Sequence, residues 1–175
     1  MEMGSFGYNV VLLLHLGLVI VGFGSSFVYP VLATKSKNMD WKERYALDHA
    51  VFGVQKYLTT FPIYGAILAG IGLVAISEMD NKQWQFKQTW VSAAFVLALV
   101  AILIAQFLHT PNLKAIDELT EKLANGTAKP GKDGGPPKEV AEVEERQAKA
   151  GMFGGALHLI FFLLIIDMIW KPGFN

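Results

Sequence analysis

The sequence predicts an all-α fold: an integral membrane four-helix bundle with up-down-up-down topology. Hydrophobic residues make up 53% of the 175 residues and charged residues only 17%. The mean hydropathy is +0.37, and this balance is too apolar for an ordinary soluble domain. Four apolar runs each reach the ~20 residues that a helix needs to cross ~30 Å of hydrocarbon. Charged residues lie at the ends of these runs.

Each of the four runs is expected to be one membrane helix. The expected bounds are about 7–33, 50–76, 90–109 and 152–170. The first ends near Tyr29-Pro30, the second is interrupted only by Gln55 and Lys56, and the third is almost purely aliphatic. Lipid offers the backbone no hydrogen-bond partners, and a membrane barrel would show alternating strands, so all four runs must be helical. The chain is then a single membrane domain, 1–175.

The connections between the runs differ in length and character. Residues 34–48 and 77–89 are expected to be short charged loops, and residues 110–151 a long cytoplasmic loop. Inside the long loop, apolar residues at helical spacing predict an amphipathic helix that lies on the membrane surface or packs on neighbouring protein. These residues are Leu113, Ile116, Leu119 and Leu123.

The rest of the long loop divides into two parts. The Gly- and Pro-rich segment 125–137 has the composition of a flexible tether, which we expect to be mobile unless a partner orders it. Good helix formers follow from Lys138, so we expect the fourth membrane helix to project into water by several turns.

Composition excludes several classes of function. Lys plus Arg (15) equals Asp plus Glu (15), so no basic field favours nucleic-acid binding. The chain has no cysteine, which excludes disulfides, thiolate metal sites, iron–sulfur clusters and a Cys nucleophile. We find no phosphate-binding glycine loop, Ser-His-Asp arrangement or carboxylate-rich metal helix, so soluble-type nucleotide or hydrolytic chemistry is disfavoured.

Orientation follows from the basic residues of the connections. The connections 34–48 and 110–151 carry most of the Lys and Arg, whereas the opposite side has only Lys82, Lys87 and Lys171. By the positive-inside rule these two connections face the cytoplasm. Both termini are therefore expected outside the cytoplasm, and the expected location is a bacterial inner membrane.

Ionisable residues inside the spans are the candidate functional residues, because burying them in lipid is costly. His15 shares one helix face with Gly22, Ser26 and Tyr29, and we expect that face to point into the bundle. On the second helix, Gly65, Ala66, Ala69 and Gly70 permit close helix approach, and on the fourth Gly151 and Gly155 precede His158.

Two histidines are the preferred haem ligands. Haem b needs a neutral imidazole on its iron and a slot between helices, and His15 and His158 are the candidate iron ligands. At 1.5 Å per residue the two lie at depths that differ by roughly 10 Å, which disfavours both binding one iron. Either the spans are shifted, or one histidine is the ligand, or no haem binds. Each also has the simpler role of a packing histidine.

The remaining ionisable residues have weaker claims. Lys56 either pairs with a haem propionate or extends to the inner interface. His49 and His109 lie at helix ends near that interface, where a histidine side chain can be solvated without a ligand. A metal or haem site formed by them is the alternative interpretation. Asp167 precedes Lys171 by four residues, the spacing of an intrahelical ion pair.

The order of these features resembles a known group of proteins. An early membrane histidine in His15-Leu-Gly, a His-bearing start of the second helix and an end in Met168-Ile169-Trp170-Lys171-Pro172 resemble small four-helix bacterial membrane proteins of an uncharacterised family. That family is related to the copper-resistance D proteins and to HemJ-type protoporphyrinogen oxidases. The resemblance implies that His15 is a haem b ligand and that Lys56 supports activity. The dense Trp, Arg and Lys pattern of the HemJ-type enzymes is absent.

The sequence therefore leads to three functional hypotheses. The first is a lipid-embedded protein that binds haem b or a similar tetrapyrrole for electron transfer or oxidation. The second is a non-catalytic accessory subunit of a larger respiratory or photosynthetic membrane complex, and the third is metal or small-solute transport. Whether the chain is an enzyme, and whether it forms a homo-oligomer, stays open.

Overall fold

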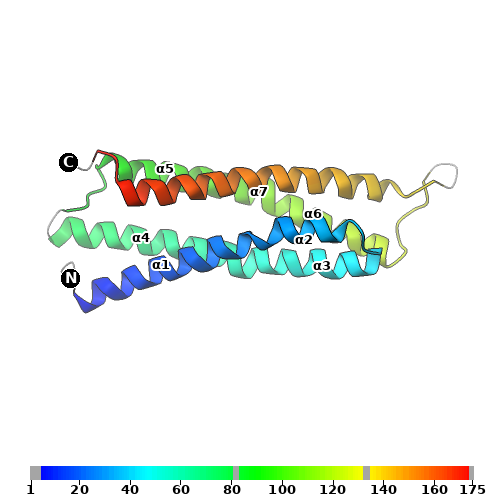
Figure 1. The fold of residues 1–175 in the computed structure, drawn as a ribbon, viewed down its shortest axis with the longest axis horizontal. Coiled ribbons are helices and arrows are strands. Elements are labelled where there is room, and N and C mark those ends of the chain that lie inside the picture. The colour runs from blue at the N-terminus through cyan, green and yellow to red at the C-terminus, as the bar shows by residue number, and fades with distance from the viewer. Residues whose placement is uncertain (1–4, 81–82, 132–134, 174–175) are drawn as a thin grey trace.

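A computed structural model describes residues 5–80, 83–131 and 135–173. The described helices are α1 (Phe6–Ser26), α2 (Val28–Ser36), α3 (Trp41–Val54), η1 (Gln55–Thr60), α4 (Phe61–Asp80), α5 (Thr89–Ile104), η2 (Ala105–His109), α6 (Thr110–Ala124) and α7 (Lys138–Trp170). They join into four columns that are long and apolar enough to cross a membrane, 6–36, 41–80, 89–124 and 138–170. The predicted all-α four-helix membrane fold is confirmed. The columns alternate in direction, and α1 begins at the end of the bundle where α7 stops (Figure 1).

The columns are longer than the apolar runs that predicted them. The second column has 40 residues, or about 60 Å at 1.5 Å per residue, twice the hydrocarbon thickness. Its first turn is closed by a capping box, in which the Asp40 carboxylate accepts from the amides of Lys42 and Glu43. The expectation of a loop over 34–48 is therefore wrong, because helix ends at Ser36 and begins again at Trp41.

The segment expected to be the start of a cytoplasmic loop continues the third column instead. Through η2 and α6 the helix runs without interruption to Ala124. Ile116, Leu119 and Thr120 are buried, and α6 packs against α3 and α7. Its apolar stripe thus packs on neighbouring protein, the second of the two alternatives that the sequence leaves open. Within the predicted tether, residues 132–134 lie outside the described residues.

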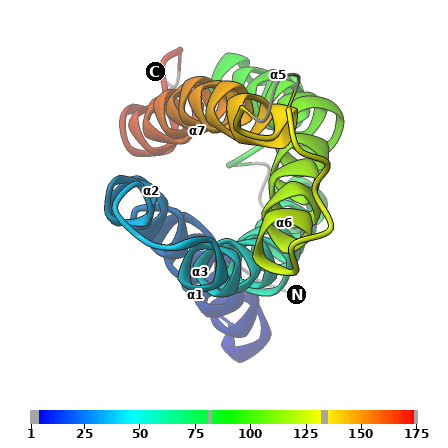
Figure 2. The same cartoon turned by 90° about the vertical axis from the view of Figure 1, so that its right-hand side faces the viewer.

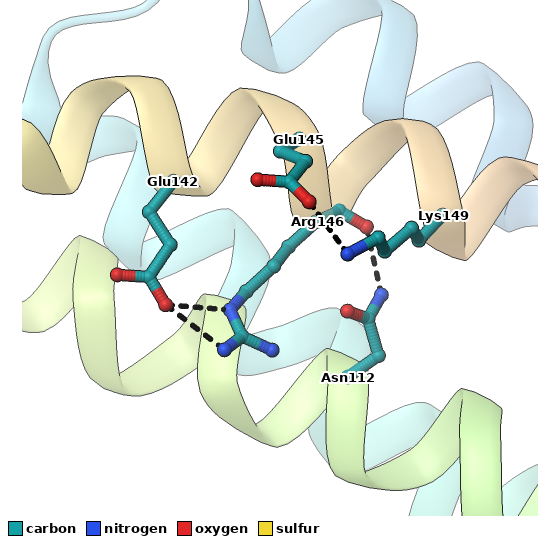
Figure 3. Close-up of polar contacts among 5 residues, drawn as sticks. All are labelled: Asn112, Glu142, Glu145, Arg146 and Lys149. Atoms are coloured by element: carbon teal, nitrogen blue, oxygen red, sulfur yellow. Dashed lines mark hydrogen bonds and ion pairs between the residues drawn. The ribbon is translucent and has the colours of Figure 1, made fainter.

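One hydrogen bond joins α6 to α7 beyond the apolar zone, and two ion pairs lie along α7 itself (Figure 3). The Asn112 amide donates to the carbonyl oxygen of Arg146 at 2.7 Å. The Arg146 guanidinium pairs with Glu142 at 2.9 Å, and Lys149 pairs with Glu145 at 2.6 Å. Both pairs have the i,i+4 spacing that stabilises an exposed helix. The first half of α7, α6 and α3 thus form a polar extension of the bundle.

The four columns pack as two tight pairs. α1 lies on α4, and α5 lies on α7. Glycine permits the first approach: a Cβ on Gly22 would lie 2.8 Å from Cγ1 of Ile63, and a Cβ on Gly65 would lie 3.0 Å from Cδ1 of Leu18. Seen along the bundle, the columns surround a central space with α7 and α1–α2 on opposite sides of it (Figure 2).

Prolines mark the irregular turns of the columns. Proline lacks the amide that would bond four residues back, and Pro30 follows the break at Phe27 between α1 and α2. Pro62 comes two residues after η1, and Pro111 comes two residues after η2. The Leu58 carbonyl, which Pro62 leaves without its helical donor, accepts from the Ser25 hydroxyl at 3.1 Å. Both π-helical turns therefore have a local cause.

Candidate functional site

An interior cavity of about 360 Å³ lies between the two pairs of columns. Its walls are mostly apolar and include small residues such as Ala66, Gly70, Ala98 and Gly154. A space of this size, lined by apolar groups with a few polar ones, is typical of small-molecule and cofactor sites. Three of the four histidines of the chain line it, His15, His109 and His158. The sequence favoured the first and third of these as iron ligands and left a metal or haem site at His109 open.

His15 is buried with one ring nitrogen engaged. Its side chain is on the α1 face that carries Gly22 and Ser26, and all three residues are buried, which confirms the predicted inward face. Nδ1 lies 2.7 Å from the carbonyl oxygen of Ala66, so Nδ1 carries the proton and donates. Within the described part of the chain, Nε2 makes no hydrogen bond. Gly70 makes this position possible, because a Cβ there would lie 3.2 Å from Cε1 of His15.

His158 has both ring nitrogens engaged. Nδ1 lies 2.7 Å from the Gly154 carbonyl oxygen and must donate to it. Nε2 lies 2.9 Å from the Ser26 hydroxyl oxygen, which also lies 2.6 Å from the carbonyl of Phe23. The Ser26 hydroxyl has one proton, which either the Phe23 carbonyl or Nε2 of His158 can accept. This arrangement gives His158 a structural partner on each side.

The structure does not bring His15 and His158 together. Ser26 contacts His158 and follows His15 by eleven residues on α1, which is ~16 Å along a straight helix. The depth offset expected from the sequence is therefore present and larger than estimated. One iron cannot take both histidines as axial ligands at this separation, so the two mark different levels of the cavity.

His109 lies near the level of His158. It is 5% exposed, and Nδ1 has no hydrogen-bond partner in the described residues. A Cβ on Gly154 would lie 3.7 Å from Cε1 of His109, and the Gly154 carbonyl is the one that accepts from His158. We expected His109 at a membrane interface. The helix instead continues past it as α6, and the side chain is buried against Gly154 of α7.

Further polar groups lie at the same level on the opposite wall. The Tyr29 hydroxyl and Thr59 Oγ1 are 2.6 Å apart, and Thr59 Oγ1 is 2.8 Å from the Ser25 hydroxyl. Gln55 lines the cavity and is 3% exposed. We call this level, defined by Tyr29, Gln55, Thr59, Gln106, His109 and His158, the inner end of the cavity.

The other end of the cavity carries a cation. Lys171 lines the cavity with Trp84 and Trp90, and its Nζ lies 4.6 Å from the Trp84 ring centre and 5.7 Å from that of Trp90. The residue has a positive φ of 44°, which turns the chain after α7. The predicted ion pair with Asp167 is wrong, because the Lys171 side chain lies over the two indoles and Asp167 Oδ2 has no partner among the described residues.

Lys56 and His49 lie outside the cavity. Lys56 is exposed, and its Nζ lies over the Tyr57 ring at 5.2 Å, which leaves no support for a propionate partner at this position. His49 is on α3, where Nδ1 lies 3.1 Å from Asp117 of α6. Across residues 5–80, 83–131 and 135–173, no group of three or more His, Asp or Glu side chains is arranged to hold a metal ion.

Comparisons with protein-family models, with curated proteins and with solved structures find no match to the chain. The cavity therefore has to be interpreted from its own residues. Sequence reasoning missed Gln55, His109 and Lys171 as cavity residues. The available signal was proline: Pro62 and Pro111 inside long helical columns indicate irregular turns just before them, and these turns change which residues face inward.

Proposed function

We propose that this protein binds haem b or a similar tetrapyrrole in its interior cavity and serves electron transfer or oxidation in the membrane. One observation carries the proposal: His15 is buried in the apolar zone, with Nδ1 bonded to the Ala66 carbonyl and Nε2 without a partner among the described residues. A metal-binding histidine commonly has this arrangement, because the second hydrogen bond fixes the tautomer and the ring orientation.

The residues around His15 fit such a group. Gly70 and Ala66 leave room beside the imidazole, and the apolar walls exclude water from it. Lys171 at the outer end offers a cation for the carboxylates of a macrocycle. It lies over Trp84, whose ring centre is 6.2 Å from that of Tyr8, and Tyr8 precedes His15 by two helical turns. Lys171 thus replaces Lys56 as the candidate partner for propionates.

The roles of the residues follow from these positions. A bound haem would supply a one-electron redox centre. His15 would hold the iron through Nε2, Ala66 would orient the ring, and Lys171 would hold the carboxylates. His158 keeps its bonds to Ser26 and Gly154, so His15 is the single histidine ligand. The resemblance to the HemJ-type proteins leads to the same residue, and membership of that wider group is part of the proposal.

The proposal includes a location. Helices that span a bilayer make this a multi-pass membrane protein, and the distribution of Lys and Arg favours a bacterial inner membrane with both termini outside the cytoplasm. The polar extension of α3, α6 and α7 would then face the cytoplasm.

Absorption spectroscopy of the detergent-purified protein tests the proposal. We expect a Soret band and a pyridine haemochrome, both lost in His15→Ala. The matched control is His49→Ala, a histidine outside the cavity, which should keep the band. A colourless protein after growth with excess haem precursor would refute the proposal. A colourless protein that co-purifies in fixed ratio with a larger complex would favour the accessory subunit instead.

A further inference from the structure

Two π-helical turns line the inner end of the cavity, η1 in the second column and η2 in the third. η1 is linked to α1 through Thr59, whose Oγ1 is 2.8 Å from the Ser25 hydroxyl. In the third column, His109 of η2 lies against Gly154, whose carbonyl bonds His158, and His158 contacts Ser26. Both turns are therefore level with the end of α1. Turns of this kind occur often at functional sites, because the extra residue redirects side chains.

Each turn directs a buried polar side chain into the cavity. Gln55 of η1 is 3% exposed and lines the cavity, and the hydrogen bond recorded for it in the described ranges is at its backbone carbonyl, which accepts from Thr60. His109 of η2 is 5% exposed, and its Nδ1 has no hydrogen-bond partner in these ranges. Buried polar groups in lipid are normally satisfied, since an unpaired one loses its hydration without compensation. Two such groups from different columns indicate a ligand that pairs with both.

The surroundings define the chemistry of that ligand. The walls between the two groups are apolar and aromatic, with Phe23, Leu157 and Phe161, so the ligand has an apolar ring. The inner end of the cavity lies where the apolar runs of the helices end. We therefore expect the apolar ligand to enter from the bilayer. A neutral imidazole and a carboxamide each have one donating and one accepting side. They can therefore hold a ring oxygen both as a carbonyl and as a hydroxyl.

We propose that the inner end of the cavity binds the ring of a lipid-soluble quinone, with His109 and Gln55 hydrogen-bonded to its two ring oxygens. The oxidised ring accepts from the imidazole N–H and the carboxamide N–H. The reduced ring donates to the imidazole nitrogen and the carboxamide oxygen. The site is separate from the level of His15 and does not require a haem.

Binding of a short-tailed quinone tests this inference. The protein is reconstituted in nanodiscs of phosphatidylcholine and phosphatidylglycerol, and the affinity for decyl-ubiquinone is measured by calorimetry. Replacing either polar group should leave a ring oxygen unpaired, so we expect roughly tenfold weaker binding for His109→Leu and for Gln55→Leu. His49→Leu is the matched control and should bind as the unaltered chain does.

A second probe separates hydrogen bonding from simple filling of space. Decylbenzene has the same tail and a ring without oxygens, and we expect it to bind at least tenfold more weakly than the quinone. Equal affinity for the two probes, or unchanged quinone affinity in both leucine variants, would overturn the inference. Helix content and melting temperature of each variant check that it is folded, and Gln55→Glu provides a second variant of the same length. An unaltered protein that has no Soret band but still binds the quinone would refute the haem proposal alone.

Discussion

Gly22 is the tightest contact between α1 and α4, and replacing it with alanine should weaken the bundle. The added Cβ would lie 2.8 Å from Cγ1 of Ile63, 3.3 Å from the Ile63 amide nitrogen and 3.3 Å from Cβ of Pro62. Ile63 is β-branched and has essentially one rotamer in a helix, and its amide and the proline ring cannot rotate away. The two helices must therefore move apart.

The expected cost follows from that overlap. Overpacking of this kind costs ~1–3 kcal/mol, and the better helix propensity of alanine offsets up to ~1 kcal/mol of it. A net loss of about 1–2 kcal/mol corresponds to a melting temperature lower by roughly 2–8 °C in a chain of this size. His15 and Ala66 lie on the same pair of helices, so their hydrogen bond should weaken too.

Thermal unfolding in detergent, followed by tryptophan fluorescence, measures this effect. Fluorescence is the suitable probe because the chain has no cysteine for a thiol dye. Gly17→Ala and Gly24→Ala are the matched controls, since a Cβ at either position meets nothing within 4 Å. Both should melt at or above the temperature of the unaltered protein. If the melting temperature of Gly22→Ala equals that of these controls, the close packing of α1 on α4 is refuted.

Three further predictions concern the cavity and the polar extension. Gly70→Ala places a Cβ 3.2 Å from Cε1 of His15, so the Soret absorbance of the purified protein should fall while helix content is unchanged. Lys171→Gln should weaken retention of a carboxylate-bearing tetrapyrrole roughly fivefold in a haem-transfer assay, whereas Lys56→Gln should not. Burial raises the pKa of Asp48, which precedes the apolar segment 50–76, from 3.8 to about 6. The folded state therefore prefers the neutral acid, and stability falls as pH rises through that range. At pH 8, Asp48→Asn should be more stable than the unaltered protein by roughly 1 kcal/mol after solvent screening, and should melt at a higher temperature. Near pH 4 the two proteins should melt at the same temperature. Equal melting temperatures at pH 8 would contradict this prediction.

The membrane fold was predictable because its cause is local. A helix in lipid needs a long apolar run, and each run is visible in the sequence without knowledge of its neighbours. The inward face of α1 was predictable for the same reason, since a regular helix repeats His15, Gly22 and Ser26 on one side. Where the helices stop was not predictable, because α6 continues only by packing its stripe on α3 and α7.

The cavity residues were only partly predictable. The sequence presents Gln55 and Lys56 as equal interruptions of an apolar run, but the π-helical turn directs Gln55 inward and leaves Lys56 outside. His109 ends its apolar run and so suggested an interface position. It is buried against Gly154, which is distant in the sequence. Such pairings depend on tertiary structure and leave no periodic pattern.

The length of the columns has a mechanical consequence. The helix that carries Gln55 begins at Trp41, and the one that carries His109 ends at Ala124, so each is a rigid rod with one end in water and its middle at the cavity. α3 and α6 are fastened to each other there by the bond between His49 and Asp117. The turns η1 and η2 lie within these continuous helices, so the cavity wall and the polar extension are parts of the same two helices.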